Sequence, residues 1–362
     1  MPFVKIHVAA IQYSVIFMLD SLTGLTMRKI YSIVIIFLLC SSSGFAQRFA
    51  DIAISGGLTN YVGDLGNEKN FPLSSANLGS SLTIRNFLNN PRRSGTYQRA
   101  IDMQVRLSWH RLQYDETEAI GNKEGAELRN YLRGIGFRND LLGTEIGFTY
   151  NFLLNKKAPL SKPKFSGFVM VGVGAYFGQP KADLFHGDVD MANRYYFWND
   201  GTVRDRPDNE KHIGEEVKKD GKYETNLHNW MTEGQGYSRE IHRKKPYENC
   251  NIGIPLGAGI RYMYNKLLTL SLEFNYYYFF TDYLDDVSGR YATYEELRAS
   301  FPNVDEFNLA RYISDPTGRG TNGFVGPVTS PRGNPNLSDA FTFLSVEASY
   351  KIKWKKKGIY GQ

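Results

Sequence analysis

The sequence predicts an all-β protein, an eight-stranded antiparallel transmembrane β-barrel with long extracellular loops. Segments that alternate between apolar and polar residues recur along the chain, the connections between them are alternately long and short, and a secretory signal peptide precedes them. The 24 tyrosines and 23 phenylalanines suit the aromatic girdles of such a barrel. A soluble all-β protein would have a similar aromatic count.

The N-terminal leader carries the export signal. From Met27 it reads MRKIYSIVIIFLLCSSSGFAQ, with a basic start, an apolar run and small residues up to Ala46. We expect cleavage after Ala46 and interpret residues 1–46 as an upstream extension plus signal peptide, with Met27 as the true start. The bulky Leu39 before Cys40 argues against a lipoprotein signal, and the apolar run is too short to span a bilayer comfortably.

The alternation is clearest in three segments, 101–110, 268–280 and 343–352. From Ile101 to Trp109 every second residue is apolar and the residues between are polar, as expected of a strand with one face in lipid. Five segments with weaker contrast bring the total to eight strands: 49–60, 77–87, 139–152, 165–177 and 251–264.

The connections alternate in length as they do in outer-membrane barrels, whose periplasmic turns are short and whose external loops are long. With both termini in the periplasm, every long connection faces outward. The long ones are 61–76, 112–138, 178–250 and 281–338, and the shorter ones are 88–98, 153–164 and 265–267. We therefore assign residues 47–354 to the barrel, 178–250 to an insertion loop and 355–362 to a basic periplasmic tail. The insertion is either a folded lobe or a flexible loop.

Charge and cysteine content exclude several classes of protein. The net charge is only +6 and basic residues are interspersed with acidic ones, so nucleic acid is not an expected partner. Cys250 is the only cysteine outside the leader, which leaves neither an internal disulfide nor a cysteine-based zinc site. We expect outer-membrane lipids as surroundings and no cofactor.

The alternation places charged residues inside the barrel, where an eight-stranded lumen is just filled by side chains. Such charges must neutralise one another, so an ion-pair network is expected, although a proton or ion path is a possible alternative. The seven residues are Arg85, Asp102, Arg106, Glu145, Arg261, Glu273 and Glu347.

Two further groups contain residue types that carry out catalysis or bind metals. Ser108 and His110 resemble the hydrolase residues of some small barrels, but no orienting carboxylate is identifiable, so we expect no enzyme and no catalytic residues. Asp282, Asp285 and Asp286 could hold calcium, yet they lack an EF-hand frame. Turn-forming and capping aspartates at a strand exit fit this spacing better, and no metal site is assigned.

The predicted periplasmic rim is strongly basic. Its charge fits either anionic lipid headgroups or an acidic periplasmic partner. The residues are Arg92, Arg93, Lys156, Lys157, Lys162, Lys164, Lys266, Lys355, Lys356 and Lys357.

Several stretches resemble the PorG family, small barrels of the type IX (Por) secretion system of Bacteroidetes. They are GGLTNYVGDL from Gly56, RNYLRGIGFRNDLLGTEIGFTYNF from Arg129, FVMVGVGAYFGQPKA from Phe168, TEGQGYS from Thr232, and the long stretch from Ile252 that ends in TDYLDDVSGRY. That ending contributes the most specific motif residues, which are Thr281, Asp282, Tyr283, Asp285 and Asp286.

The resemblance implies a non-enzymatic barrel in the outer membrane of a Gram-negative, Bacteroidetes-like bacterium. It also implies contact with the periplasmic ring of the secretion machine, built from PorK-like and PorN-like proteins, and a role in protein export and gliding motility. The alternative is a binding or adhesion barrel that uses its long extracellular loops.

Overall fold

The computed structural model describes residues 49–66, 75–87, 101–152, 165–208, 214–235, 246–265, 267–321 and 331–353. The fold described below is the compact unit Phe49–Ile352. The signal peptide, the tail 355–362 and all the basic rim residues named above lie outside the described residues.

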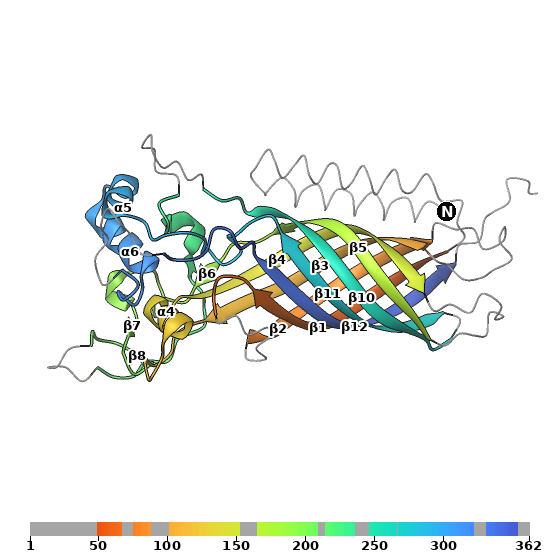
Figure 1. Ribbon diagram of the computed structural model, residues 1–362, viewed down its shortest axis with the longest axis horizontal. Coiled ribbons are helices and arrows are strands. Elements are labelled where there is room, and N and C mark those ends of the chain that lie inside the picture. The colour runs from red at the N-terminus through yellow and green to blue at the C-terminus, as the bar shows by residue number, and fades with distance from the viewer. Residues whose placement is uncertain are drawn as a thin grey trace, which may run out of the picture. The chain divides into compact units, whose positions relative to one another are not determined.

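Eight long antiparallel strands close into a barrel (Figure 1). Each strand pairs with its neighbour in the chain, β12 returns to β1, and β4 follows β3 across a continuous ladder from Ile101↔Tyr150 to Asp115↔Gly136. The prediction of an eight-stranded antiparallel barrel is confirmed. The strands are β1 (Phe49–Val62), β2 (Asn77–Phe87), β3 (Ile101–Asp115), β4 (Gly136–Phe152), β5 (Phe165–Phe177), β10 (Cys250–Met263), β11 (Leu268–Phe279) and β12 (Ala340–Lys353).

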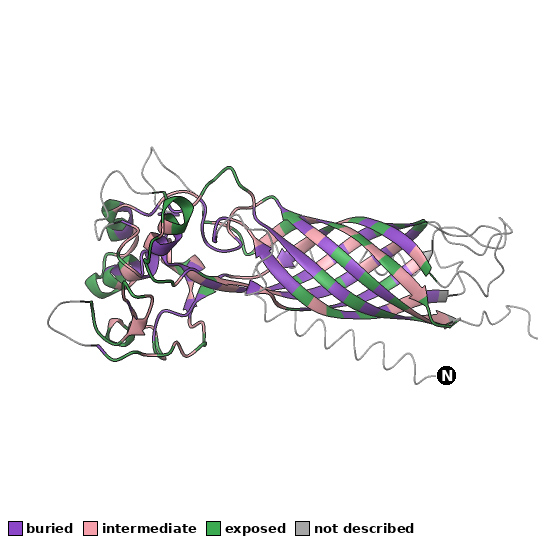
Figure 2. Cartoon of the chain, turned by 60° about the horizontal axis from the view of Figure 1, so that its bottom comes forward, coloured by how far each residue is buried: buried purple, intermediate pink, exposed green. Residues whose placement is uncertain are grey.

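The barrel wall alternates between buried and exposed residues along every strand (Figure 2). Large apolar residues are exposed on the outside, for example Leu272 at 47% and its cross-strand neighbour Val346 at 62%. In water such an outer face would be unfavourable, whereas in lipid it is the required surface, because a closed barrel leaves no unpaired strand edge. The protein is therefore a β-barrel of the outer membrane of a Gram-negative bacterium.

Two strands extend further than the sequence pattern predicts. β3 continues to Asp115 and β4 begins at Gly136, so the connection between them is shorter than the predicted 112–138. The outward residues of this extension are polar, and Arg111 and Arg138 both pair with Asp140 at 2.8 Å. The apolar–polar contrast ends where the wall leaves the lipid, and this is why the sequence pattern ended too early.

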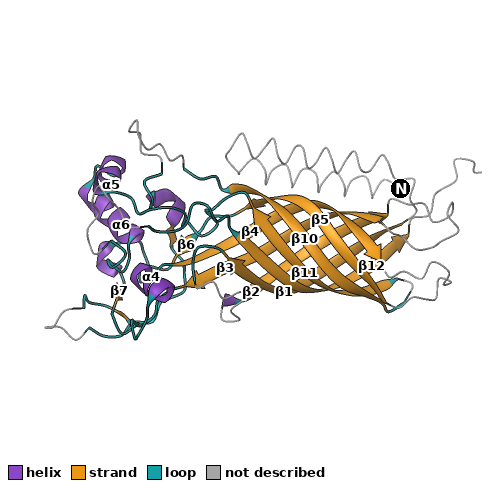
Figure 3. Cartoon of the chain, viewed as in Figure 1, coloured by secondary structure: helices purple, strands orange, loops and turns teal. Residues whose placement is uncertain are grey.

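The remaining elements all lie in the long connections at one end of the barrel, here called the loop end (Figure 3). The described part of the insertion is folded, since β6 pairs with both β4 and β9. No described helix is long and apolar enough to cross a membrane. The loop-end elements are α4 (Gly125–Arg133), β6 (Lys181–Ala182), η2 (Met191–Asn193), β7 (Tyr196–Phe197), β8 (Val203–Arg204), β9 (Thr225–Asn226), η3 (Leu227–Trp230), α5 (Tyr294–Ser300) and α6 (Val304–Ser314).

A charge on the lipid face tests the membrane assignment. Val346→Arg should lower the free energy of unfolding by about 2–4 kcal/mol, because an arginine near the bilayer midplane loses its hydration. The measurement is a urea titration of the protein folded into phospholipid vesicles. Ile120→Arg, which replaces an exposed apolar residue of the loop end, is the matched control and should have little effect. Equal effects of the two substitutions would contradict the assignment.

Candidate functional site

The barrel lumen is filled by paired charges. Arg85 donates two hydrogen bonds to the Glu347 carboxylate, at 2.7 and 2.5 Å. Arg106 pairs with Glu273 at 2.7 Å and lies 3.9 Å from Glu145. All five residues are at most 2% exposed. In this environment an unpaired charge is costly, so the pairs fix one another in place.

A third pair lies toward the end of the barrel that is opposite the loop end, here called the turn end. Arg261 lies 3.2 Å from Asp102 and donates to the Asn151 amide oxygen at 2.6 Å, while Asn151 donates to Asp102 at 2.8 Å. The structure therefore brings all seven predicted lumen residues together, as three ion-paired groups. Amide side chains complete the groups, and Gln104 accepts from Arg85 at 3.0 Å.

An aromatic layer closes the lumen toward the loop end. The Tyr277 and Phe341 rings stack with centroids 4.3 Å apart, and His110 lies 4.7 Å from Phe343. Tyr176 and Phe279 belong to the same buried cluster, which continues into loop-end residues. Ser108 donates to Glu145 at 3.0 Å, while the ring nitrogens of the fully buried His110 have no hydrogen-bond partner. Ser108 and His110 are thus not arranged as a nucleophile and its base.

A double-mutant cycle tests the lumen pairing. Arg85→Met or Glu347→Met alone should destabilise the barrel by about 3–5 kcal/mol, because each leaves a buried charge without its partner. The double substitution should recover most of that loss, since both charges are then removed. Urea titration in lipid vesicles gives the free energy of unfolding of the wild type, the two single variants and the double variant. Additive losses in the double variant would contradict the pairing.

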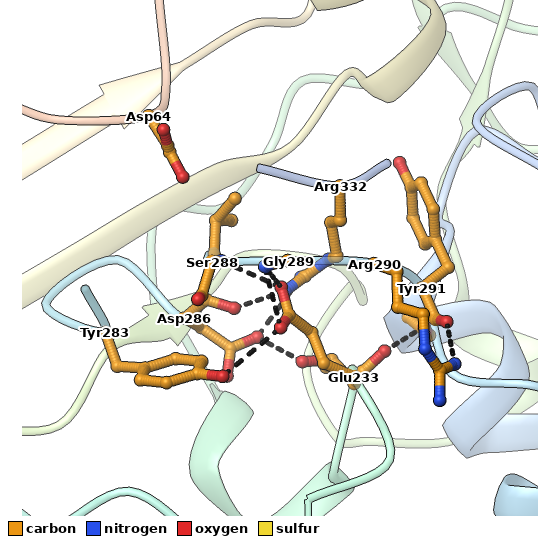
Figure 4. A network of polar contacts seen from close by, with 12 residues as sticks. Asp64, Glu233, Tyr283, Asp286, Ser288, Gly289, Arg290, Tyr291 and Arg332 are labelled. Atoms are coloured by element: carbon orange, nitrogen blue, oxygen red, sulfur yellow. Dashed lines mark hydrogen bonds and ion pairs between the residues drawn. The ribbon is translucent and has the colours of Figure 1, made fainter. Parts of the chain in front are cut away.

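Above the aromatic layer, the four long connections meet in a buried polar network, here called the loop junction. Figure 4 shows its centre around Glu233, Asp286 and Arg332. The network comprises Asp64, Glu116, Arg133, Thr232, Glu233, Tyr247, Tyr283, Asp285, Asp286, Ser288, Gly289, Arg332 and Asp339. Because its members come from all four connections, it fixes these connections relative to one another and to the barrel mouth.

Glu233 and Asp286 accept most of the hydrogen bonds at the centre of the junction. Glu233 accepts from the backbone amides of Ser288 at 2.8 Å and Gly289 at 3.0 Å. Asp286 accepts from the Thr232 hydroxyl at 2.6 Å and the Tyr247 hydroxyl at 2.8 Å. These bonds hold Asp286 in a left-handed backbone conformation, with φ of 71°, which is unfavourable for a residue with a side chain.

Two buried arginines neutralise the acidic side chains. The Arg332 guanidinium lies 3.1 Å from Asp286 and 3.7 Å from Glu233, and also donates to the Asp286 carbonyl oxygen. Arg133 donates to Glu116 at 2.6 and 2.8 Å and to the carbonyl oxygens of Arg332 and Asp64 at 2.7 and 2.8 Å. Charge-assisted bonds of this kind are stronger than neutral ones, so the arginines link the connections firmly.

A carboxyl pair lies where the junction meets the barrel. The Tyr61 hydroxyl donates to Asp285 at 2.5 Å and lies 3.2 Å from Asp339, whose other oxygen accepts from the Leu284 amide at 2.8 Å. Burial raises the pKa of Asp285 and of Asp339 well above the usual range, and the charge of Asp285 raises that of Asp339 further. Burial also raises the pKa of Asp64 to about 6. These carboxyls therefore hold their protons more tightly than exposed ones do.

The structure gives the strand-exit aspartates more contacts than the turn interpretation anticipated. Asp285 does accept locally from the Val287 amide at 2.9 Å, as a turn-forming residue would. However, Asp285 and Asp286 are also fully buried and bonded to distant segments. Sequence reasoning missed Arg133, Glu233 and Arg332 because single charges in long loops follow no periodicity. Arg133 and Glu233 lie in stretches that resemble the PorG family, and this resemblance is the signal in the sequence that points to them.

No protein-family model matches the chain, and no curated protein matches it. Solved structures of several outer-membrane proteins are similar to this chain, among them the following three. Ail of Yersinia pestis is 9% identical, with 84% of this chain and 99% of that chain covered and a TM-score of 0.30. Neisserial surface protein A is 8% identical, with 84% of this chain and 97% of that chain covered and a TM-score of 0.30. OprG of Pseudomonas aeruginosa is 8% identical, with 85% of this chain and 98% of that chain covered and a TM-score of 0.32. Likeness at this level carries no inference about function.

Removing the central cation tests the loop junction. Arg332→Met should leave Asp286 and Glu233 as buried, uncompensated carboxylates and so destabilise the loop end by about 3–5 kcal/mol. The measurement is amide hydrogen exchange. We expect faster exchange at the loop end of the variant and unchanged exchange in the barrel strands. Arg298→Met, which removes an exposed arginine of α5, is the control. Unchanged exchange in the Arg332 variant would show that the junction does not hold the loops.

Proposed function

We propose that the protein is a non-enzymatic anchoring barrel of the type IX secretion machinery, contacting its periplasmic PorK-like and PorN-like ring proteins in a Bacteroidetes-like bacterium. One observation carries the proposal. Four of the stretches that resemble the PorG family, although far apart in sequence, supply residues of a single loop junction: Asp64, Arg133, Glu233 and Asp286. These four stretches therefore share a structural role, which is to form the loop junction that holds the long connections rigidly.

Rigidity of this kind suits an anchor better than a channel or an enzyme. The described lumen contains paired charges and stacked rings along its length, and eight strands leave no open passage. The polar side chains of the loop junction are bonded to one another, which leaves few free to act on a substrate. A stable barrel held in the membrane is what a periplasmic assembly needs as an attachment point.

The proposed docking surface is the basic rim. Its residues belong to the connections at the turn end and to the C-terminal tail, and all lie outside the described residues. Long-range attraction between this rim and an acidic partner would favour association. Attraction to anionic lipid headgroups is the competing explanation for the charge.

The alternative function is a binding or adhesion barrel, and one observation favours it. A cleft of about 740 Å³ opens between the η2 segment of the insertion and α6, with Arg194, Arg311 and Tyr312 among its lining residues. This volume is in the range of small-molecule sites.

Whole-cell crosslinking followed by affinity purification distinguishes the two functions. With a tag in the insertion, we expect the ring proteins to co-purify with the wild type. The Lys355→Ser, Lys356→Ser, Lys357→Ser variant should recover several-fold less, because it loses three charges of the rim. A loop-end control with Lys123→Ser, Arg206→Ser and Lys218→Ser removes the same charge and should behave as the wild type.

Two results would overturn the anchoring function. One is the absence of ring proteins from wild-type material under conditions that capture known ring contacts. The other is an equal loss in the rim and loop-end variants. Crosslinks confined to the loop end, to a ligand or surface component, would support the adhesion alternative.

A further inference from the structure

The insertion contains an acidic cluster that is separate from the loop junction. Asp183 follows β6, and Asp220 and Glu224 precede β9. One carboxylate oxygen from each residue lies within 4.8 Å of the other two. The cluster joins two stretches of the insertion that are about forty residues apart in sequence, as the β6–β9 pairing also does.

Backbone amides hold the three carboxylates in place. Glu224 accepts from the amides of Leu184 at 3.0 Å and Phe185 at 3.1 Å. Asp183 accepts from the Gly221 amide at 2.8 Å. Asp220 accepts from the Gly187 amide at 3.1 Å and the Lys222 amide at 3.0 Å. Because these bonds fix the carboxylates, the side chains cannot turn apart freely to relieve their mutual repulsion.

Two oxygens of the cluster are buried without a hydrogen-bond partner. Asp183 is only 6% exposed, and its Oδ1 is shielded from solvent with no donor in reach. The Oε2 of Glu224 is also shielded from solvent and has no hydrogen-bond partner. Buried carboxylate oxygens are almost always satisfied by a donor or a cation. This observation is independent of the spacing of the cluster, and it shows two buried oxygens that are able to accept a positively charged ligand.

Neighbouring lysines neutralise the cluster only in part. Lys222 lies 3.1 Å from Asp220, but its side chain is 64% exposed. The Lys219 ammonium is engaged with Asp115 at 2.8 Å. Among the described residues, neither Asp183 nor Glu224 has an ion-pair partner.

We propose that Asp183, Asp220 and Glu224 bind a divalent cation of the calcium class. The donors are all carboxylate oxygens, which favour hard cations over zinc or copper. Calcium accepts irregular geometry with added water ligands, whereas magnesium requires a near-ideal octahedron. The cation links the two stretches of the insertion at β6 and β9, and it thereby stabilises the insertion on the extension of β4.

Terbium luminescence tests the site in the full-length protein. Terbium replaces calcium in oxygen sites and emits when a nearby tyrosine is excited. Tyr195 is suitably placed, since its hydroxyl accepts from the Asp220 amide at 3.0 Å. We expect saturable emission after chelator treatment, reversed by calcium at lower concentrations than by magnesium. The variant with Asp183→Asn and Glu224→Gln should bind terbium at least tenfold more weakly.

The matched control carries Asp208→Asn and Glu215→Gln, which remove the same charge from exposed positions of the insertion. It should bind as the wild type does. A second measurement needs no variant: calcium should slow proteolysis of the wild-type insertion relative to chelator. The proposal is overturned if the wild type gives no saturable emission, if the site and control variants bind alike, or if calcium leaves the wild-type proteolysis rate unchanged.

Discussion

The whole structure depends on the requirement that every backbone donor and acceptor in the membrane finds a partner within the wall. Lipid provides no hydrogen bonds, so the sheet must close, and here the continuous β3–β4 ladder and the β1–β12 neighbours complete the circle. Closure with eight strands then fixes the width of the lumen. The narrow lumen constrains the inward side chains, because those from opposite walls must fill the space and match in charge.

This width explains why the interior changes character along its length. Between the lipid-facing strands the lumen holds ion pairs, such as Arg85 with Glu347. Toward the loop end the same inward positions are occupied by rings, such as Tyr277 and Phe341. This aromatic layer separates the polar interior of the barrel from the loop end, and the loops pack on it. The cluster that contains these rings continues to Leu284 and Val287, just below the loop junction.

The loop junction solves a second problem, which is how to hold long connections that have no strand partners. Polar side chains take the role that ladder hydrogen bonds have in the wall. Arg133 and Arg332 each reach two or more connections, and Glu233 accepts from the chain at Ser288 and Gly289. A guanidinium suits this task because its donors point in several fixed directions. The proposed cation at Asp183 would serve the insertion in the same way.

The sequence by itself determined the barrel, its eight strands and the lumen residues, since Arg106 and Glu273 follow from simple alternation across a two-sided wall. It could not determine where β3 and β4 end, because the polar residues around Arg111 and Asp140 no longer face lipid. It did not reveal the helices of the last connection or the folding of the insertion. Only the tertiary structure brought Glu233 to Asp286, and Asp183 to Glu224. Contacts between loops depend on where distant segments lie in space, and such contacts leave no periodic pattern in the chain.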